Sequence, residues 1–79
     1  MLDTTQIVDF LGNELGVDTS AISDETPLFS SGLVDSFSLV RLMVFLENAG
    51  RFRINPTDVS LENMDSIARI MRFVAQATA

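Results

Sequence analysis

The residues with the clearest chemical potential are Asp35 and Ser36, which lie at the predicted start of a helix. A hydroxyl at a helix N-terminus lies beside backbone N–H groups that have no partner within the helix. The helix dipole adds partial positive charge there, so a phosphate on that oxygen would be stabilised. Ser36 is thus a suitable place to attach a phosphate-linked group. The structural alternative is that Asp35 caps the helix and Ser36 is an ordinary residue of its first turn.

Other catalytic chemistries lack the side chains that they need. The chain of 79 residues contains no His, no Cys and no Lys, and its five basic residues are all Arg. His-based triads, thiol nucleophiles, Ser–Lys pairs and metal sites built from His or Cys are therefore excluded. We expect that the protein is not an enzyme, and that any thiol required for its function is supplied from outside the polypeptide.

Three helical stretches are expected to position these residues. The first spans residues 4–15, with a capping box formed by Asp3 and Gln6 and a stop at Gly16. The second, residues 36–49, follows Asp35 as its cap and ends at Gly50, and the third runs to about residue 76. The third helix has three candidate caps: Asn63, Asp65 and Ser66. A short helical turn is predicted over residues 55–59, with Asn55 as its cap and Pro56 as its first residue.

A long connection, residues 17–34, joins the first two helices. Loops of this length usually have a function. Its apolar side chains are expected to pin it across the bundle, and they are Ile22, Leu28, Phe29, Leu33 and Val34. Residues 30–32, Ser-Ser-Gly, predict a turn shortly before the second helix. The sequence therefore predicts one all-α domain over residues 1–79: a small bundle of three main helices plus one short helix, with a long loop between the first and second helices.

The second helix has two apolar faces on a helical wheel of about 100° per residue. One face is the predicted core stripe, formed by Leu39, Leu42, Met43 and Leu46. The opposite face holds Phe37, Arg41, Val44 and Asn48. The outer face of such a helix is normally polar, so Phe37 and Val44 suggest a surface for docking a partner. In the alternative interpretation, the long loop covers them.

Charge is distributed unevenly along the chain. Residues 1–40 contain seven acidic residues and no basic one, whereas residues 41–79 contain four acidic residues and five Arg, for a net charge of −6. An acidic surface disfavours nucleic acid and favours partners with basic surfaces. No apolar run approaches the roughly 20 residues that span a bilayer, and no signal peptide is recognisable. We expect a cytoplasmic monomer that binds neither nucleic acid nor membrane.

Residues 26–42, Thr-Pro-Leu-Phe-Ser-Ser-Gly-Leu-Val-Asp-Ser-Phe-Ser-Leu-Val-Arg-Leu, resemble the attachment region of acyl and peptidyl carrier proteins. The similarity extends to the length of the chain, the long first loop, the acidic balance, the short helix at residues 55–59 and the final helix. Asp-Ser followed by an apolar residue is weak by itself. Its position after the long loop and at the start of a two-faced helix makes the resemblance specific.

The resemblance implies a carrier of acyl or aminoacyl groups. A phosphopantetheinyl transferase would move 4′-phosphopantetheine from coenzyme A to Ser36, and Asp35 would help the transferase to recognise the site. The arm ends in a thiol, which would hold the cargo as a thioester. Loading and transferring enzymes would contact Phe37, Val40, Arg41 and Val44. The alternative is a non-enzymatic helical adaptor that binds a protein partner through Phe37 and Val44 without modification.

The second helix differs from that of fatty-acid-synthesis carriers, which usually carry several acidic residues there. Here the positions expected to be exposed include Ser38, Arg41 and Asn48, and only Glu47 is acidic. A basic partner surface would be repelled by Arg41. The chain is therefore closer to stand-alone peptidyl or aminoacyl carriers, which implies a role in natural-product (polyketide or nonribosomal peptide) biosynthesis.

Overall fold

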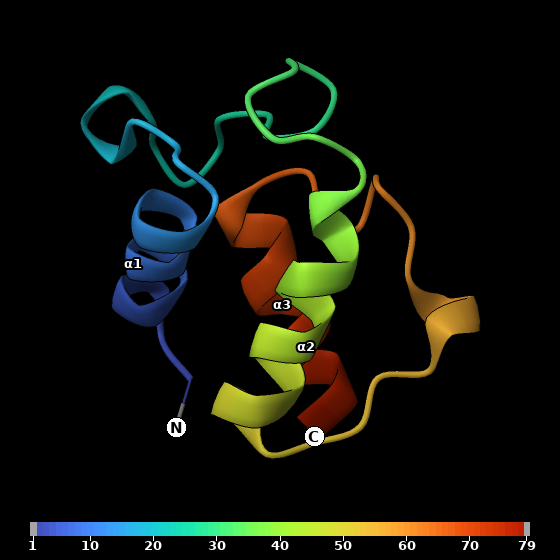
Figure 1. The fold of residues 1–79 in the computed structure, drawn as a ribbon. Coiled ribbons are helices and arrows are strands. Elements are labelled where there is room, and N and C mark those ends of the chain that lie inside the picture. Colours follow the sequence, from blue (N-terminus) through green and yellow to red (C-terminus); the bar gives the residue numbers. More distant parts are fainter. Residues whose placement is uncertain (1, 79) are drawn as a thin grey trace.

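The helices found in the computed structural model, which describes residues 2–78, follow the predicted order. They are α1 (Thr4–Glu14), α2 (Ser38–Gly50) and α3 (Ile67–Thr78), with short 3₁₀ helices η1 (Thr19–Ala21) and η2 (Pro56–Asp58) (Figure 1). No strand occurs within the described residues. The predicted all-α bundle of three main helices plus one short helix is thereby confirmed, with η2 as the short helix. The sequence did not predict η1.

Apolar side chains from the three helices meet in one core. α1 packs against α3. The helical residues buried in this core are Ile7, Leu11, Leu42, Leu46, Ile67, Ile70 and Val74. Leu28 and Val34, from the long connection, are buried in the same cluster. The connection is thus part of the core, and this anchors the segment that leads into α2.

The two ends of α1 follow their sequence signals. Asp3 Oδ1 accepts a hydrogen bond from the Gln6 N–H (3.0 Å), and Gln6 Oε1 accepts one from the Asp3 N–H (2.9 Å), so the predicted capping box is present. Gly16 has a φ of +72°, as a residue that ends a helix in the left-handed region requires. The helix ends at Glu14, one residue earlier than predicted.

Both ends of α2 differ from the prediction. Regular α-helix begins at Ser38 rather than Ser36, because the preceding turn closes with shorter-range bonds, from the Ser38 N–H to the Asp35 oxygen and from the Leu39 N–H to the Ser36 oxygen. Gly50 is the last helical residue, and Arg51 takes the left-handed conformation with a φ of 55°.

At Gly50 the packing of a neighbouring side chain, and not a left-handed backbone, favours glycine. A Cβ at this position would lie 2.6 Å from a ring carbon of Phe52, which folds back over the end of the helix. The helix was predicted to run to Ala49 and to stop at Gly50; it includes Gly50, so its end is one residue later than predicted.

The long connection is anchored by most, but not all, of its apolar residues. Ile22 and Phe29 pack against the core that contains Leu28 and Val34. Leu33 is 47% exposed, so the prediction that it pins the loop was wrong. The predicted turn is confirmed, because the Gly32 N–H bonds to the Phe29 oxygen (3.1 Å) and Gly32 has a φ of +84°. This turn directs Leu33 away from the core.

Ser66 is the cap that α3 uses, since its Oγ accepts a hydrogen bond from the Arg69 N–H (3.1 Å). The helix begins at Ile67 and ends two residues beyond the predicted end. The short η2 also has its predicted cap, because Asn55 Oδ1 accepts hydrogen bonds from the Thr57 N–H (3.1 Å) and hydroxyl (2.9 Å).

Candidate functional site

Ser36 lies in the turn that leads into α2. In Figure 1, the start of α2 lies at the end of the bundle opposite to the N-terminal end of α1 and the C-terminal end of α3. The residue is exposed, and its hydroxyl makes no hydrogen bond with any residue in the described range 2–78. A free hydroxyl on an exposed turn is accessible to an incoming enzyme.

Asp35 fixes the backbone on both sides of this serine. Its Oδ1 accepts a hydrogen bond from the Phe37 N–H (2.7 Å), and its backbone oxygen accepts one from the Ser38 N–H (2.9 Å). The Ser36 oxygen accepts from the Leu39 N–H (3.2 Å). Asp35 thus caps the turn that contains Ser36 and not α2 itself, whose N-cap position is Phe37, so the predicted helix cap was wrong by two residues. Because the N–H groups of the three following residues are already paired, they are not free to bind a phosphate, contrary to the sequence-based argument. The dipole of α2 remains favourable to one.

The outer face of α2 is apolar and uncovered. Phe37 is 86% exposed, Val40 65% and Val44 51%, and Arg41 is also exposed. Their spacing of three, four and seven residues places them on one side of the helix. The alternative interpretation, in which the long loop covers Phe37 and Val44, is therefore wrong. These four residues are called the outer α2 face below.

Two further exposed apolar residues were not predicted. Leu33 is 47% exposed and lies three residues before Ser36, and Leu61 is 43% exposed in the segment between η2 and α3. No local pattern in the sequence distinguishes Leu33 from its buried neighbour Val34, whose N–H bonds to the Leu28 oxygen.

The only acidic residue of α2 is not free. Glu47 is half-buried, and its Oε2 accepts a hydrogen bond from the Ile54 N–H (2.8 Å). Ser38, predicted to be exposed, is also half-buried. The outer α2 face therefore presents one positive charge, that of Arg41, and its helix offers no unpaired carboxylate within the described structure.

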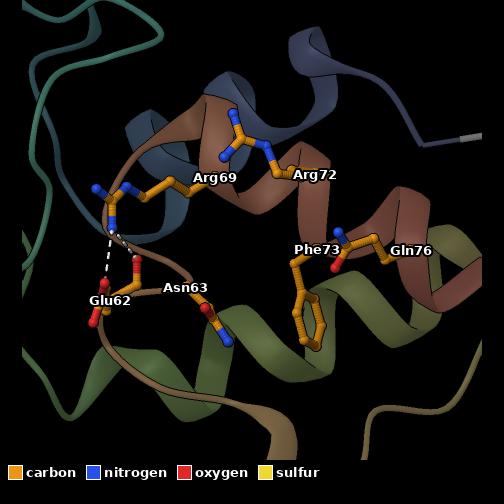
Figure 2. A pocket seen from close by; sticks show the side chains of 6 residues that line it. All are labelled: Glu62, Asn63, Arg69, Arg72, Phe73 and Gln76. Atoms are coloured by element: carbon orange, nitrogen blue, oxygen red, sulfur yellow. Dashed lines mark hydrogen bonds and ion pairs between the residues drawn. The ribbon is translucent and has the colours of Figure 1, made fainter.

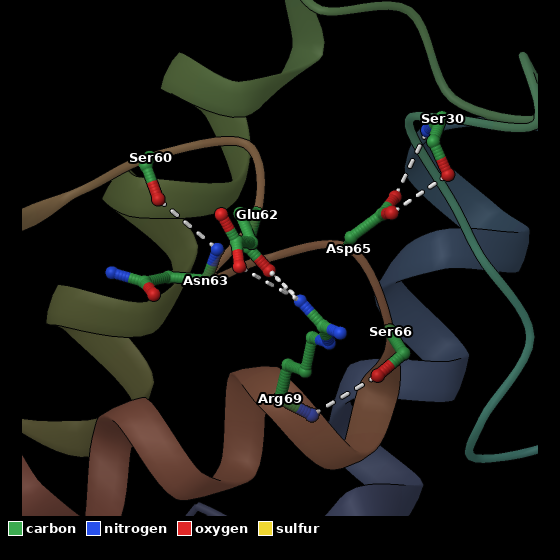
Figure 3. Close-up of polar contacts among 7 residues, drawn as sticks. All are labelled: Ser30, Ser60, Glu62, Asn63, Asp65, Ser66 and Arg69. Carbon is green, nitrogen blue, oxygen red and sulfur yellow. Dashed lines mark hydrogen bonds and ion pairs between the residues drawn. The ribbon is translucent and has the colours of Figure 1, made fainter.

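Asp65 is a polar site that sequence analysis treated only as a possible helix cap. Its Oδ1 accepts hydrogen bonds from the N–H groups of Phe29 (2.7 Å) and Ser30 (2.9 Å), and its Oδ2 accepts one from the Ser30 hydroxyl (2.7 Å) (Figure 3). The bond from the Ser30 N–H is the main cause that lowers the pKa of Asp65 below its ordinary value, although partial burial opposes it. No signal in the sequence pairs residues 35 positions apart.

A shallow cavity of about 290 Å³ lies along α3 (Figure 2). It is lined by Glu62, Asn63, Arg69, Arg72, Phe73 and Gln76. Arg69 Nη1 donates to the Glu62 backbone oxygen (3.0 Å) and lies 3.8 Å from Glu62 Oε1. None of the residues predicted for attachment or docking lines this cavity.

Residues 2–78 contain no cluster of three or more His, Cys, Asp or Glu side chains that could hold a metal ion. They also contain no helix with the length and apolar character needed to cross a bilayer.

The chain matches a protein family described as "Phosphopantetheine attachment site", over residues 5–74. No significant match to a curated protein was found. The matched range contains all of α1 except its first residue, the long connection, α2 and most of α3. The exposed hydroxyl of Ser36 also fits phosphopantetheine, because attachment of that group forms a phosphodiester and needs a free alcohol. The chain therefore belongs to the phosphopantetheine-binding family of carrier proteins, whose members hold 4′-phosphopantetheine as a covalently attached group.

Proposed function

We propose that Ser36 is the residue that carries 4′-phosphopantetheine. The observation that supports this assignment is the exposed, unbonded Ser36 hydroxyl at the start of α2, on a turn whose backbone is held by Asp35. Transfer from coenzyme A would form a bond between Ser36 Oγ and the phosphorus of the arm, release adenosine 3′,5′-bisphosphate, and pass the serine proton to the transferase. The arm supplies the terminal thiol that holds acyl or aminoacyl cargo as a thioester.

The polypeptide itself holds the arm and presents the cargo, and partner enzymes form and break the bonds of the cargo. Asp35 holds the turn in place, so that the serine is presented in one orientation to the transferase. The outer α2 face offers partner enzymes an apolar contact beside the attachment point. Holding the cargo on one domain raises its effective concentration at each enzyme that docks.

We further propose that the cargo is aminoacyl or peptidyl, and that the pathway is natural-product assembly. This proposal is supported by the charge of the outer α2 face, where Arg41 is the only charged residue and Glu47 is paired with the Ile54 N–H. A partner matched to this face would be apolar with a carboxylate opposite Arg41, rather than basic.

Intact-mass spectrometry after incubation with coenzyme A, Mg²⁺ and a broad-specificity phosphopantetheinyl transferase tests the attachment. The expected result is one added phosphopantetheine on the wild-type chain and none on Ser36→Ala. Ser38→Ala is the matched control, because it removes a hydroxyl two residues away, and it is expected to be modified like the wild type. Modification of Ser36→Ala, or none of the wild type, contradicts the assignment.

Intact-mass spectrometry of the protein isolated from its native host tests the cargo. The proposal predicts an amino acid or peptide bound through a bond that hydroxylamine cleaves. A fatty acyl or polyketide group at that position would contradict the aminoacyl assignment while leaving the attachment at Ser36 intact.

A further inference from the structure

The segment that leads to Ser36 is hydrogen-bonded to the residue that precedes the start of α3 by two positions, Asp65. Asp65 binds the loop formed by residues 28–36, here called the pre-α2 loop, through both its side chain and its backbone. Its carboxylate accepts the three hydrogen bonds from Phe29 and Ser30 described above, and its backbone oxygen accepts one from the Leu28 N–H (2.7 Å). Four bonds thus join two segments that are more than 30 residues apart.

Asp65 is not needed to cap α3. The Ser66 hydroxyl accepts the Arg69 N–H, and the Ser66 backbone oxygen accepts the Ile70 N–H (2.9 Å) (Figure 3). The Asp65 carboxylate points away from the helix to the pre-α2 loop, as Figure 3 shows. An ionised carboxylate only accepts hydrogen bonds, which suits a site where two N–H groups and a hydroxyl converge.

Fixing residues 28–30 also fixes the residues that precede Ser36. Leu28 is fully buried, and its backbone oxygen accepts a hydrogen bond from the Val34 N–H (2.9 Å). The turn between them brings the chain back to Val34, which is 4% exposed and stands two residues before Ser36. Ordering a backbone costs roughly 1–2 kcal/mol per residue, so a loop with little regular structure needs such fixed points to hold one conformation.

We infer that Asp65 is a positioning residue for the transfer of phosphopantetheine: by holding the pre-α2 loop against the start of α3, it fixes the orientation in which the Ser36 hydroxyl and Leu33 meet the transferase. This inference rests on the proposed attachment at Ser36. Asp65 acts through the loop and touches neither the serine nor the outer α2 face. Its loss therefore lowers kcat of modification more than it raises KM for the carrier.

Three variants test the inference with coenzyme A and a transferase. Asp65→Ala removes all the side-chain bonds, and we expect kcat/KM for the carrier to fall about tenfold, as loss of orientation predicts. Asp65→Asn is expected to keep most of the rate, because its amide oxygen can accept both N–H groups and its NH₂ can donate to the Ser30 hydroxyl. Asp24→Ala is the matched control: Asp24 lies beside α3, and within residues 2–78 its backbone oxygen accepts the Ala68 N–H while its side chain makes no hydrogen bond.

Amide hydrogen exchange supplies a readout that is independent of the transferase. The Phe29 and Ser30 amides should lose protection in Asp65→Ala while the α1 and α2 amides keep theirs. Should Asp65→Ala be too unstable to assay, Ser30→Ala removes only the bond to Oδ2 and should lower kcat about twofold to threefold, less than Asp65→Ala because both backbone N–H bonds remain.

The outcomes separate this inference from the proposed function. If the wild-type chain is modified and Asp65→Ala is modified at the same rate, or if the Phe29 and Ser30 amides stay protected, the positioning role is wrong and the attachment stands. The same conclusion follows if Ser30→Ala, assayed in place of an unstable Asp65→Ala, keeps the full rate. If the wild-type chain accepts no group, the attachment at Ser36 is wrong and the positioning role fails with it.

Discussion

At the scale of single residues, Asp35 and Asp65 make the same kind of hydrogen bond to partners at very different distances along the sequence. Each carboxylate accepts backbone N–H groups, but Asp35 binds a residue two positions away and Asp65 binds residues 35 and 36 positions away. The first interaction could be predicted, because short Asp side chains commonly cap the turn that they begin. The second could not, because only the folded chain brings the two segments together.

The low pKa of Asp65 predicts a pH-dependent contribution to stability. The hydrogen bond from the Ser30 N–H stabilises the ionised form in the folded state, so the folded pKa lies below the ordinary value of 3.8. The contribution is therefore complete above that value and is lost as the pH falls through the folded pKa.

Urea unfolding of the wild type and of Asp65→Asn between pH 7 and pH 2.5 measures this contribution. We expect the variant to be less stable by about 1 kcal/mol near neutral pH, less than for a fully buried charge-assisted hydrogen bond because solvent screens the partly exposed carboxylate. The difference should shrink once the pH falls below 3.8. A difference that stays constant over the whole range would contradict the assignment.

At the scale of elements, helix interiors were predicted better than helix ends. The apolar stripes of α1, α2 and α3 follow from the spacing of their residues, and so does the exposed outer α2 face. The start of α2 was misplaced by two residues because an Asp cap is equally compatible with a tight turn. Its end was misplaced because the close packing of Phe52 on Gly50 leaves no mark in the local sequence.

The end of α2 provides a prediction about stability. A left-handed conformation at a residue other than Gly costs roughly 1 kcal/mol, and Arg51 has a φ of 55°. We expect Arg51→Gly to raise the free energy of unfolding by about 0.5–1 kcal/mol, measured by urea denaturation followed by circular dichroism.

Gly50→Ala is the contrasting control at the adjacent position. It should lower stability, because the added Cβ meets the Phe52 ring at 2.6 Å. If Arg51→Gly instead lowers the free energy of unfolding, the Arg51 side chain must stabilise the fold by more than its left-handed backbone conformation destabilises it.

At the scale of the whole molecule, the long connection is part of the core. A chain of 79 residues is expected to have a stability of only about 4–12 kcal/mol. The burial of Leu28 and Val34 therefore supplies a large share of what holds the molecule together, while the neighbouring Leu33 remains at the surface. The sequence predicted that apolar residues anchor this loop, but not which of them are buried.

Leu28 and Leu33 form a matched pair for testing this. Leu28→Ala should lower the free energy of unfolding by about 2–5 kcal/mol, as expected for a fully buried Leu. Leu33→Ala should change it by less than about 0.5 kcal/mol. Urea denaturation of both variants under the same conditions measures the difference, and equal effects would show that the connection does not contribute to the core as described.

The direction in which α2 runs through the bundle has a practical consequence. The molecule measures 31 × 23 × 20 Å, and α2 runs from the end that holds Ser36 to the end where α1 begins and α3 finishes (Figure 1). At 1.5 Å per residue, that helix separates the two poles by roughly 20 Å. An affinity tag, a surface linker or a fused reporter joined ahead of α1 or behind α3 would thus lie at the end of the bundle away from Ser36. The protein could then be immobilised for assay with Ser36 facing the solution.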